Sequence, residues 1–221
     1  MIPKLSGPML APQSGAAPKQ IVVLLHGYGS DGADLIGLAP HWQSVLPDAL
    51  FVAPNAHETV PGYPSGYQWF APAMTGDRVA GRQIGVALAA PVLLAFLADL
   101  WEQTGLSAKD TLLGGFSQGA MMALHVGLSL PDSLMGVIAF SGSFLPPGSF
   151  GNSDLPKPPV CIVHGDMDQM VELASSDQAY EALMAAGYDV RYHVSRGVGH
   201  GIAPDGLAFA TEFITEIMPV K

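Results

Sequence analysis

Short apolar runs bounded by glycine or proline alternate with helical patterns along almost the whole chain. The runs are rich in Val, Ile, Leu and Phe without obvious alternation, which is typical of strands buried on both faces of a parallel sheet. They lie at Ile21–Leu25, Leu50–Ala53, Thr111–Leu113, Gly136–Phe140, Val160–Val163 and Val190–Val194. This alternation implies βαβ units, and so predicts an α/β fold with a mostly parallel central sheet and helices on both faces.

The intervening stretches show helical patterns, at Asp34–Leu46, Val79–Thr104, Gln118–Leu130, Ala174–Ala186 and Asp205–Met218. The longest apolar run, Ile84–Ala98, lies in the second of these; we interpret it as a core-facing helix that Pro91 kinks, too short to span a bilayer. Three stretches do not fit the alternation. Residues 55–75 and 143–159 read as long loops, and an edge strand is expected around Pro3–Leu10.

The size and composition of the chain indicate one packed domain. It has 221 residues, of which 49% are apolar and only 13% charged, a composition that excludes a disordered or coiled-coil protein. We find no internal repeat and no linker, and therefore expect a single domain over residues 1–221. The loops are too short to form a large cap domain.

The charge balance and the cysteine count limit the classes of partner and of metal site that the chain can have. A net charge of −10 argues against a nucleic acid or an anionic membrane as partner, and we expect no stable membrane insertion. The single cysteine, Cys161, excludes an internal disulfide and a cysteine-based zinc site. No apolar stretch follows a basic start near residue 1, so we find no secretory signal and expect a cytoplasmic protein. An apolar-rich surface is compatible with a homodimer.

The central motif is Gly115-Phe116-Ser117-Gln118-Gly119, which follows an apolar strand and opens a helix. A Gly-x-Ser-x-Gly sequence at a strand-to-helix corner is the pattern of a nucleophile elbow, where a tight turn presents the serine above the sheet. The alternative is a glycine-rich turn with an ordinary serine. Placement between strand and helix favours Ser117 as a nucleophile.

An activated serine needs a histidine base and an acid that orients it, in the chain order Ser, Asp or Glu, His for an α/β-hydrolase. Asp168 follows the strand Val160–Val163 and is the expected acid, with Asp166 as the alternative. His200 lies between glycines in a loop before the last helix and is the expected base. His164 and His193 are interpreted as structural.

Catalysis also needs donors for the oxyanion, and the backbone N–H groups of Tyr28 and Gln118 are the candidates. Tyr28 lies in the loop Gly27-Tyr28-Gly29-Ser30-Asp31-Gly32, whose glycines let N–H groups face a ligand. The same loop fits the G-x-G-x-x-G fingerprint of a dinucleotide-dependent oxidoreductase. Against that alternative, the next strand ends at Asn55 without the acid that would hold a ribose. His26 is interpreted as structural.

In combination, the motifs resemble the phospholipase/carboxylesterase family of α/β-hydrolases, which includes bacterial carboxylesterases and the acyl-protein thioesterases. The segments that carry the resemblance run from about Ile21 to the C-terminus: LLHGYGSDGADL, LFVAPNA, GFSQGA, SGSF, HGDMDQMV and GVGHGI. The resemblance implies the same nucleophile, acid, base and oxyanion donors, and an aromatic pair near the acyl pocket that matches Trp69 and Phe70.

Together these features predict a serine hydrolase that cleaves carboxylic esters with short to medium acyl chains, and possible substrates include thioesters and lysophospholipids. It would use a Ser117–His200–Asp168 triad and an acyl-enzyme, with no metal and no organic cofactor. A non-catalytic binding protein with this fold is the other alternative, against which the complete set of three residues argues. Apolar side chains expected to bind substrate are Trp69, Phe70, Phe144, Leu145 and Met170.

Overall fold

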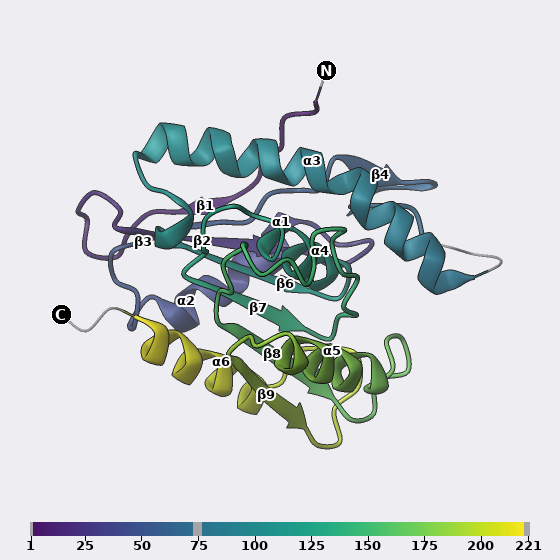
Figure 1. The fold of residues 1–221 in the computed structure, drawn as a ribbon. Coiled ribbons are helices and arrows are strands. Elements are labelled where there is room, and N and C mark those ends of the chain that lie inside the picture. Colours follow the sequence, from purple (N-terminus) through teal and green to yellow (C-terminus); the bar gives the residue numbers. More distant parts are fainter. Residues whose placement is uncertain (1, 73–76, 219–221) are drawn as a thin grey trace.

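The computed structural model describes residues 2–72 and 77–218 and contains a seven-stranded central sheet (Figure 1). In spatial order its strands are β1 (Met9–Leu10), β3 (Ala49–Val52), β2 (Gln20–Leu25), β6 (Thr111–Phe116), β7 (Gly136–Phe140), β8 (Val160–Gly165) and β9 (Val190–Ser195). Only β1 pairs antiparallel, with β3, and all other pairs in this sheet are parallel. The mostly parallel sheet and the six predicted buried strands are confirmed, with β9 at one edge, and the expected additional edge strand is the short β1 at the other.

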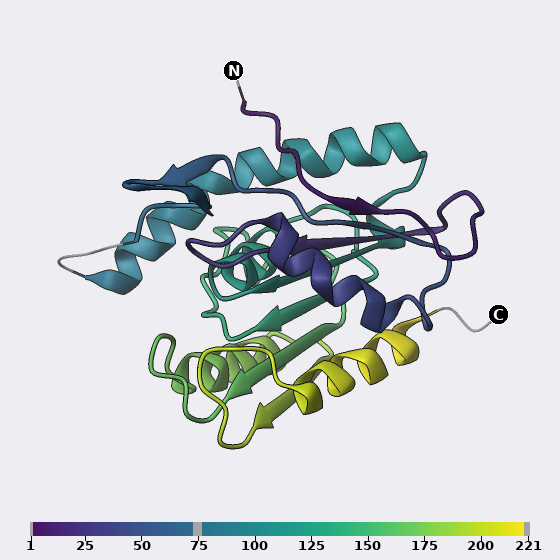
Figure 2. The ribbon, with the colours of Figure 1, turned by 180° about the vertical axis from the view of Figure 1, so that it is seen from behind.

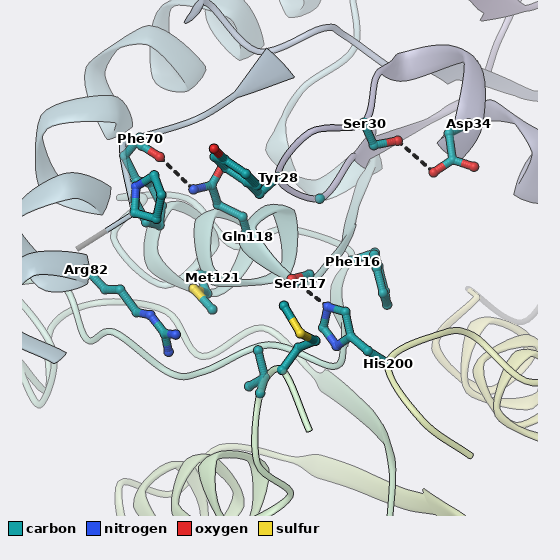
Figure 3. A pocket seen from close by; sticks show the side chains of 14 residues that line it. Tyr28, Ser30, Asp34, Phe70, Arg82, Phe116, Ser117, Gln118, Met121 and His200 are labelled. Carbon is teal, nitrogen blue, oxygen red and sulfur yellow. Dashed lines mark hydrogen bonds between the residues drawn. The ribbon is translucent and has the colours of Figure 1, made fainter. Parts of the chain in front are cut away.

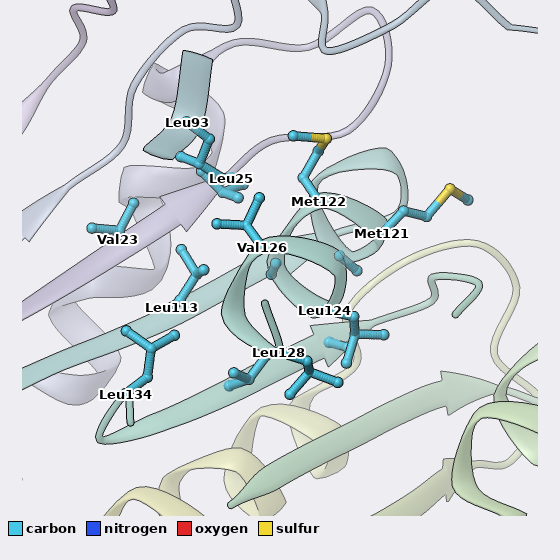
Figure 4. Close-up of a cluster of buried hydrophobic side chains, with 14 of the residues drawn as sticks. Val23, Leu25, Leu93, Leu113, Met121, Met122, Leu124, Val126, Leu128 and Leu134 are labelled. Atoms are coloured by element: carbon cyan, nitrogen blue, oxygen red, sulfur yellow. The ribbon is translucent and has the colours of Figure 1, made fainter. Parts of the chain in front are cut away.

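Helices cover both faces of the sheet, as Figure 2 shows from behind. One face carries α3 (Arg78–Thr104), α4 (Gln118–Gly127) and α5 (Ala174–Ala185); the other carries α1 (Gly32–Leu35), η1 (Ile36–Leu38), α2 (Ala39–Trp42) and α6 (Pro204–Ile217). Successive residues of a strand point to opposite faces. Val23 and Leu25 therefore pack under α3 and α4 (Figure 4), whereas Val22 and Leu24 join the core beneath α2 and α6.

The stretch predicted as one helix over 34–46 is divided instead into α1, η1 and α2. Gly37 and Pro40 explain the division, because glycine weakens a helix and proline removes one of its N–H donors. Proline is favoured in the first turn, and Pro40 stands in the first turn of α2. The single-helix prediction was wrong at this position.

Residues 55–75 were predicted as a loop. Residues 73–75 lie outside the described residues, and residues 55–72 contain an antiparallel hairpin of β4 (Glu58–Val60) and β5 (Tyr63–Gln68). The connecting turn has Gly62 at a φ of 78°, a backbone conformation that glycine adopts without strain. The N–H of Gly29 donates to the carbonyl of Tyr67 over 2.8 Å. The hairpin thus holds the loop that follows β2. Residues 143–159 form no helix or strand, as predicted.

Helix α3 runs unbroken past Pro91, although its ribbon bends near the middle (Figure 1), as an internal proline favours. The helix is longer than the apolar run noted in the sequence. By length and composition alone it is long and apolar enough to cross a membrane, with a mean hydropathy of 2.1 in its most apolar window. A core helix meets the same criterion, and α3 packs Val86, Leu93 and Leu97 fully against the sheet.

Candidate active site

The candidate site lies at the carboxyl ends of the parallel strands, where β2 and β6 are neighbours. From β2 the chain continues outward to β3, whereas from β6 it continues in the opposite direction to β7. Ligand sites of open α/β sheets lie at such a reversal of strand order. Loops after β2, β6, β8 and β9 meet here around a cavity of about 280 Å³, drawn in Figure 3.

Ser117 occupies a strained turn between β6 and α4. Its φ of 53° and ψ of −114° lie outside the regions that most side chains tolerate. A Cβ added at Gly115 would collide with the backbone of Gly119, and one added at Gly119 would collide with the Leu25 carbonyl. The turn can therefore form only with glycine at both positions, which is the geometry predicted for a nucleophile elbow.

We expect Gly119→Ala to lower the free energy of unfolding by about 3 kcal/mol or more, because the Leu25 carbonyl belongs to a central strand and cannot move aside. Urea unfolding of both proteins would measure the difference. Gly37→Ala is the matched control, since a Cβ at Gly37 meets no atom within 4 Å. Equal stability of the Gly119 and Gly37 variants would show that the elbow is looser than described.

Ser117, His200 and Asp168 come together although they lie on three separate segments. The Nε2 atom of His200 is 3.0 Å from the Ser117 Oγ, and its Nδ1 atom is 2.6 Å from an oxygen of Asp168. Asp168 is fully shielded, whereas the His200 ring is partly exposed. Burial alone would raise the pKa of the Asp168 carboxyl, but hydrogen bonds from His200 and from two backbone N–H groups outweigh it and hold that pKa below its usual value.

Asp168 is itself held in place by groups behind it. One oxygen accepts hydrogen bonds from the N–H groups of Met170 and Val171, at 2.8 and 2.9 Å. Buried His164 lies 3.3 Å from the other oxygen, with its Nε2 2.8 Å from the Val171 carbonyl and its Nδ1 2.6 Å from the Ser176 Oγ. A carbonyl only accepts, so the Nε2 of His164 carries a proton. The structural interpretation of His164 is confirmed.

Asp166, the alternative acid, lies away from His200 and has a different partner. Its carboxylate accepts a hydrogen bond from the Gly197 N–H over 2.6 Å, which fixes the loop that carries His200. The turn at Gly197 has a φ of 72°, which favours glycine. The geometry thus selects Asp168 as the partner of His200.

Tyr28 and Gln118, the expected oxyanion donors, both line the same cavity. Gln118 is the first residue of α4, so its backbone N–H has no partner within the helix. Tyr28 lines the cavity, and across the described residues its N–H makes no hydrogen bond to the protein. The Gln118 side chain has a separate role. Its Oε1 accepts from the Trp69 N–H and its Nε2 donates to the Phe70 carbonyl, each over 2.7 Å.

His26 is buried beneath the Tyr28 loop and is structural, as predicted. Its Nε2 accepts a hydrogen bond from the Ala56 N–H over 2.9 Å, and its Nδ1 lies 2.7 Å from the Gly27 carbonyl. Burial lowers the pKa of His26 below its usual value, and the same cause lowers the pKa of His125, which bonds to the Leu145 carbonyl.

These two histidines predict acid destabilisation. A buried neutral histidine binds fewer protons in the folded protein than in the unfolded chain. Its contribution to the free energy of unfolding is therefore complete above the pKa of the unfolded chain, and it is lost as the pH falls below about 6.5. Between about pH 7.5 and 5.5 we expect the free energy of unfolding to fall by about 1 kcal/mol for each histidine. Urea titrations at both values would measure this. His125→Gln should reduce the loss and exposed His41→Gln should not; equal losses in both would contradict the assignment.

The predicted apolar residues divide into three groups. Phe70 and Met170 line the cavity beside Ser117. Phe144 and Leu145 line a neighbouring cavity instead. The prediction for Trp69 was wrong: its side chain is fully buried, and its ring N–H donates to the His26 carbonyl over 3.0 Å. The sequence does not indicate which ring of an aromatic pair faces the cavity.

Other cavity residues were missed, among them Met121 and Arg82. Met121 is buried in the core and also lines the cavity, because it lies one turn of α4 beyond Ser117 and faces the same way. Arg82 comes from α3, far along the chain from every motif, so no sequence pattern points to it.

The dinucleotide alternative does not fit the local structure. A fingerprint loop leads into a helix whose N-terminus receives the pyrophosphate, but here the loop leads into the four-residue α1. Gly27 and Tyr28 of this loop line the cavity beside Ser117. In the described part of the chain, no three His, Cys, Asp or Glu side chains gather as a metal site would require.

Comparison with known proteins adds the decisive observation. The family model described as Phospholipase/Carboxylesterase matches residues 11–218. The chain belongs to this family. Esterase YpfH of Escherichia coli is 30% identical over 91% of this chain and 84% of its own length. Acyl-protein thioesterase 1 of Neurospora crassa is 28% identical over 96% of this chain and 92% of its own.

Solved structures agree with the family assignment. The crystal structure of esterase PE8 superposes with a TM-score of 0.92 and is 53% identical, covering 97% of this chain and all of the other. A carboxylesterase of Bacillus cereus, 18% identical, shares the fold with a TM-score of 0.79 over 97% of this chain and 95% of its own. The protein is a carboxylesterase of the serine hydrolase class with an α/β-hydrolase fold, and the predictions of family, fold and enzyme class are confirmed.

Proposed function

We propose that this carboxylesterase cleaves esters of short to medium acyl chains by a two-step mechanism centred on Ser117. The observation that carries the proposal is the continuous hydrogen-bonded series from Ser117 Oγ through His200 to Asp168. His200 takes the Ser117 proton as the oxygen attacks the ester carbonyl. Asp168 keeps the Nδ1 proton in place and stabilises the imidazolium that forms.

In the tetrahedral intermediate, the carbonyl oxygen becomes an oxyanion. The proposed donors to this oxyanion are the backbone N–H groups of Tyr28 and Gln118, a role supported by the position of both residues in the cavity lining. The positive end of the α4 dipole favours the same charge. The intermediate collapses as His200 returns its proton to the leaving oxygen, which departs as the alcohol. Water then attacks the acyl-enzyme by the same steps, and the carboxylic acid is released with Ser117 restored.

The lining of the cavity supports a modest acyl group. Phe70, Met121, Met170 and Val171 give it a predominantly apolar wall. At about 280 Å³ the cavity lies at the small end of ligand pockets, which suits short and medium chains better than long ones.

The cytoplasmic location and a homodimer stay predictions.

Hydrolysis of p-nitrophenyl esters from acetyl to palmitoyl tests the chain-length proposal. We expect kcat/KM to peak at short or medium chains and to fall once the acyl group exceeds the cavity. Acyl thioesters of the same lengths would show whether sulfur leaving groups are also accepted. A fluorophosphonate probe, followed by peptide mass spectrometry, should label Ser117. Label on another serine, or no label on folded protein, would overturn the proposed nucleophile.

A further inference from the structure

A second cavity of about 300 Å³ adjoins the catalytic cavity, and Arg82 lines both. Its other walls come from the loop after β7, which contributes Phe144 and Leu145, and from α5, which contributes Gln178. A third hollow lies on the opposite side of the catalytic cavity and shares Asp34, Phe116 and His200 with it. The site therefore extends in two directions from Ser117, toward the Arg82 guanidinium on one side and the Asp34 carboxylate on the other.

Arg82 is the only charged side chain among the described residues that line the second cavity. It forms no ion pair or hydrogen bond with the described part of the chain. Ser143 lines the same cavity and is 9% exposed. Its buried hydroxyl has no hydrogen-bond partner among the described residues. In a protein with a net charge of −10, a cavity that holds an unpaired guanidinium, an unpaired hydroxyl and no carboxylate is suited to an anion.

The position of His200 decides which part of a substrate reaches Arg82. His200 protonates the leaving group, so the leaving group lies on the His200 side of Ser117. In Figure 3, Phe116, Ser30 and Asp34 lie on that side, and Arg82, Phe70 and Met121 lie on the other. The acyl chain is therefore the part that extends toward Arg82. Asp34, which is exposed, would repel an anionic leaving group.

We infer that the preferred substrates are esters whose acyl chain ends in a second, free carboxylate, that is, half-esters of dicarboxylic acids. The inference rests on the proposed function of Ser117. The acyl chain passes over Met121 and Phe70, and its distal carboxylate binds the Arg82 guanidinium and accepts a hydrogen bond from the Ser143 hydroxyl. Arg82 is in this account a specificity-determining residue.

The test compares monomethyl adipate with dimethyl adipate as substrates. Cleavage of the methyl ester is measured from the acid that it releases. We expect kcat/KM to favour the half-ester, and Arg82→Gln to reduce that preference by about 10- to 100-fold, since a charge-assisted hydrogen bond is lost. Monomethyl esters from succinate to suberate would locate the optimal spacing. Ser143→Ala should reduce the same preference by a smaller factor and provides a second test if Arg82→Gln fails to fold. Arg78→Gln, on the exposed start of α3, is the matched control and should leave the preference unchanged.

Two further substrates test the direction of binding. A carboxylate on the alcohol part should bring no gain, so 4-acetoxybutanoate should be no better than butyl acetate. Arg82→Glu should instead favour methyl 6-aminohexanoate, whose acyl chain ends in an ammonium group. A gain with 4-acetoxybutanoate would overturn the assignment of Arg82 to the acyl side.

The outcomes separate this inference from the proposed function. Cleavage of dimethyl adipate without any preference for half-esters would overturn the inference and leave the esterase mechanism intact. An Arg82→Gln variant that loses activity equally on both substrates would also overturn it, because the arginine would then act on structure. No cleavage of any ester, with no fluorophosphonate label on Ser117, would instead overturn the proposed function.

Discussion

Replacing Ser117 with alanine is expected to lower kcat/KM for p-nitrophenyl butyrate by about 10³-fold or more while leaving the fold intact. The loss is large because the hydroxyl supplies the only bond that joins the acyl group to the enzyme in the proposed mechanism. Residual hydrolysis should persist, since the oxyanion donors and the cavity still bind the substrate. Initial rates at saturating and low substrate concentrations would separate kcat from KM, and we expect the loss in kcat.

The strain at Ser117 makes this variant a sharper test. Alanine keeps the Cβ and must adopt the same φ of 53°, so the variant should unfold at nearly the same urea concentration as the wild type. Ser129→Ala, beyond the opposite end of α4, is the matched control and should retain full activity. A Ser117→Ala protein that is folded and fully active would show that another residue is the nucleophile.

The fold was predictable because its signals are local. The strand Val160–Gly165 is buried along its whole length, and its first four residues read as an uninterrupted apolar run. The elbow motif spans only five consecutive residues, although the Leu25 carbonyl of the neighbouring strand also requires glycine at position 119. The pairing of Ser117 with Asp168 and His200 could be proposed because chain order and the strand ends constrain where each loop lies.

The features that sequence reasoning missed depend on contacts between distant segments. The β4–β5 hairpin forms because its strands pair with each other and with the loop after β2, and a segment rich in Pro, Gly and Tyr shows no strand periodicity. Trp69 faces the core because Gln118, 49 residues away, fixes its backbone. Arg82 enters the site only because α3 packs beside α4, a contact that no local pattern encodes.

Asp168→Asn should cost about 10⁴-fold in kcat, and the structure shows why a change of one atom has this effect. The Met170 and Val171 N–H groups must face an acceptor, so the asparagine keeps its carbonyl oxygen toward them. Its amide nitrogen then takes the place 2.6 Å from His200 Nδ1 and donates to it. That bond places the imidazole proton on Nε2, facing Ser117, where His200 can no longer accept the serine proton.

His164 adds to the cost of the same substitution. Its Nε2 proton is fixed by the Val171 carbonyl, and it lies 3.3 Å from the oxygen that the amide would replace, so two donors would face each other in a buried site. We therefore expect a loss of about 1 to 3 kcal/mol in the free energy of unfolding along with the loss of kcat. The control is Asp205→Asn, because Asp205 also pairs with a histidine, His193, but at the surface and away from Ser117. It should retain full activity; an Asp168→Asn enzyme as active as this control would remove Asp168 from the mechanism.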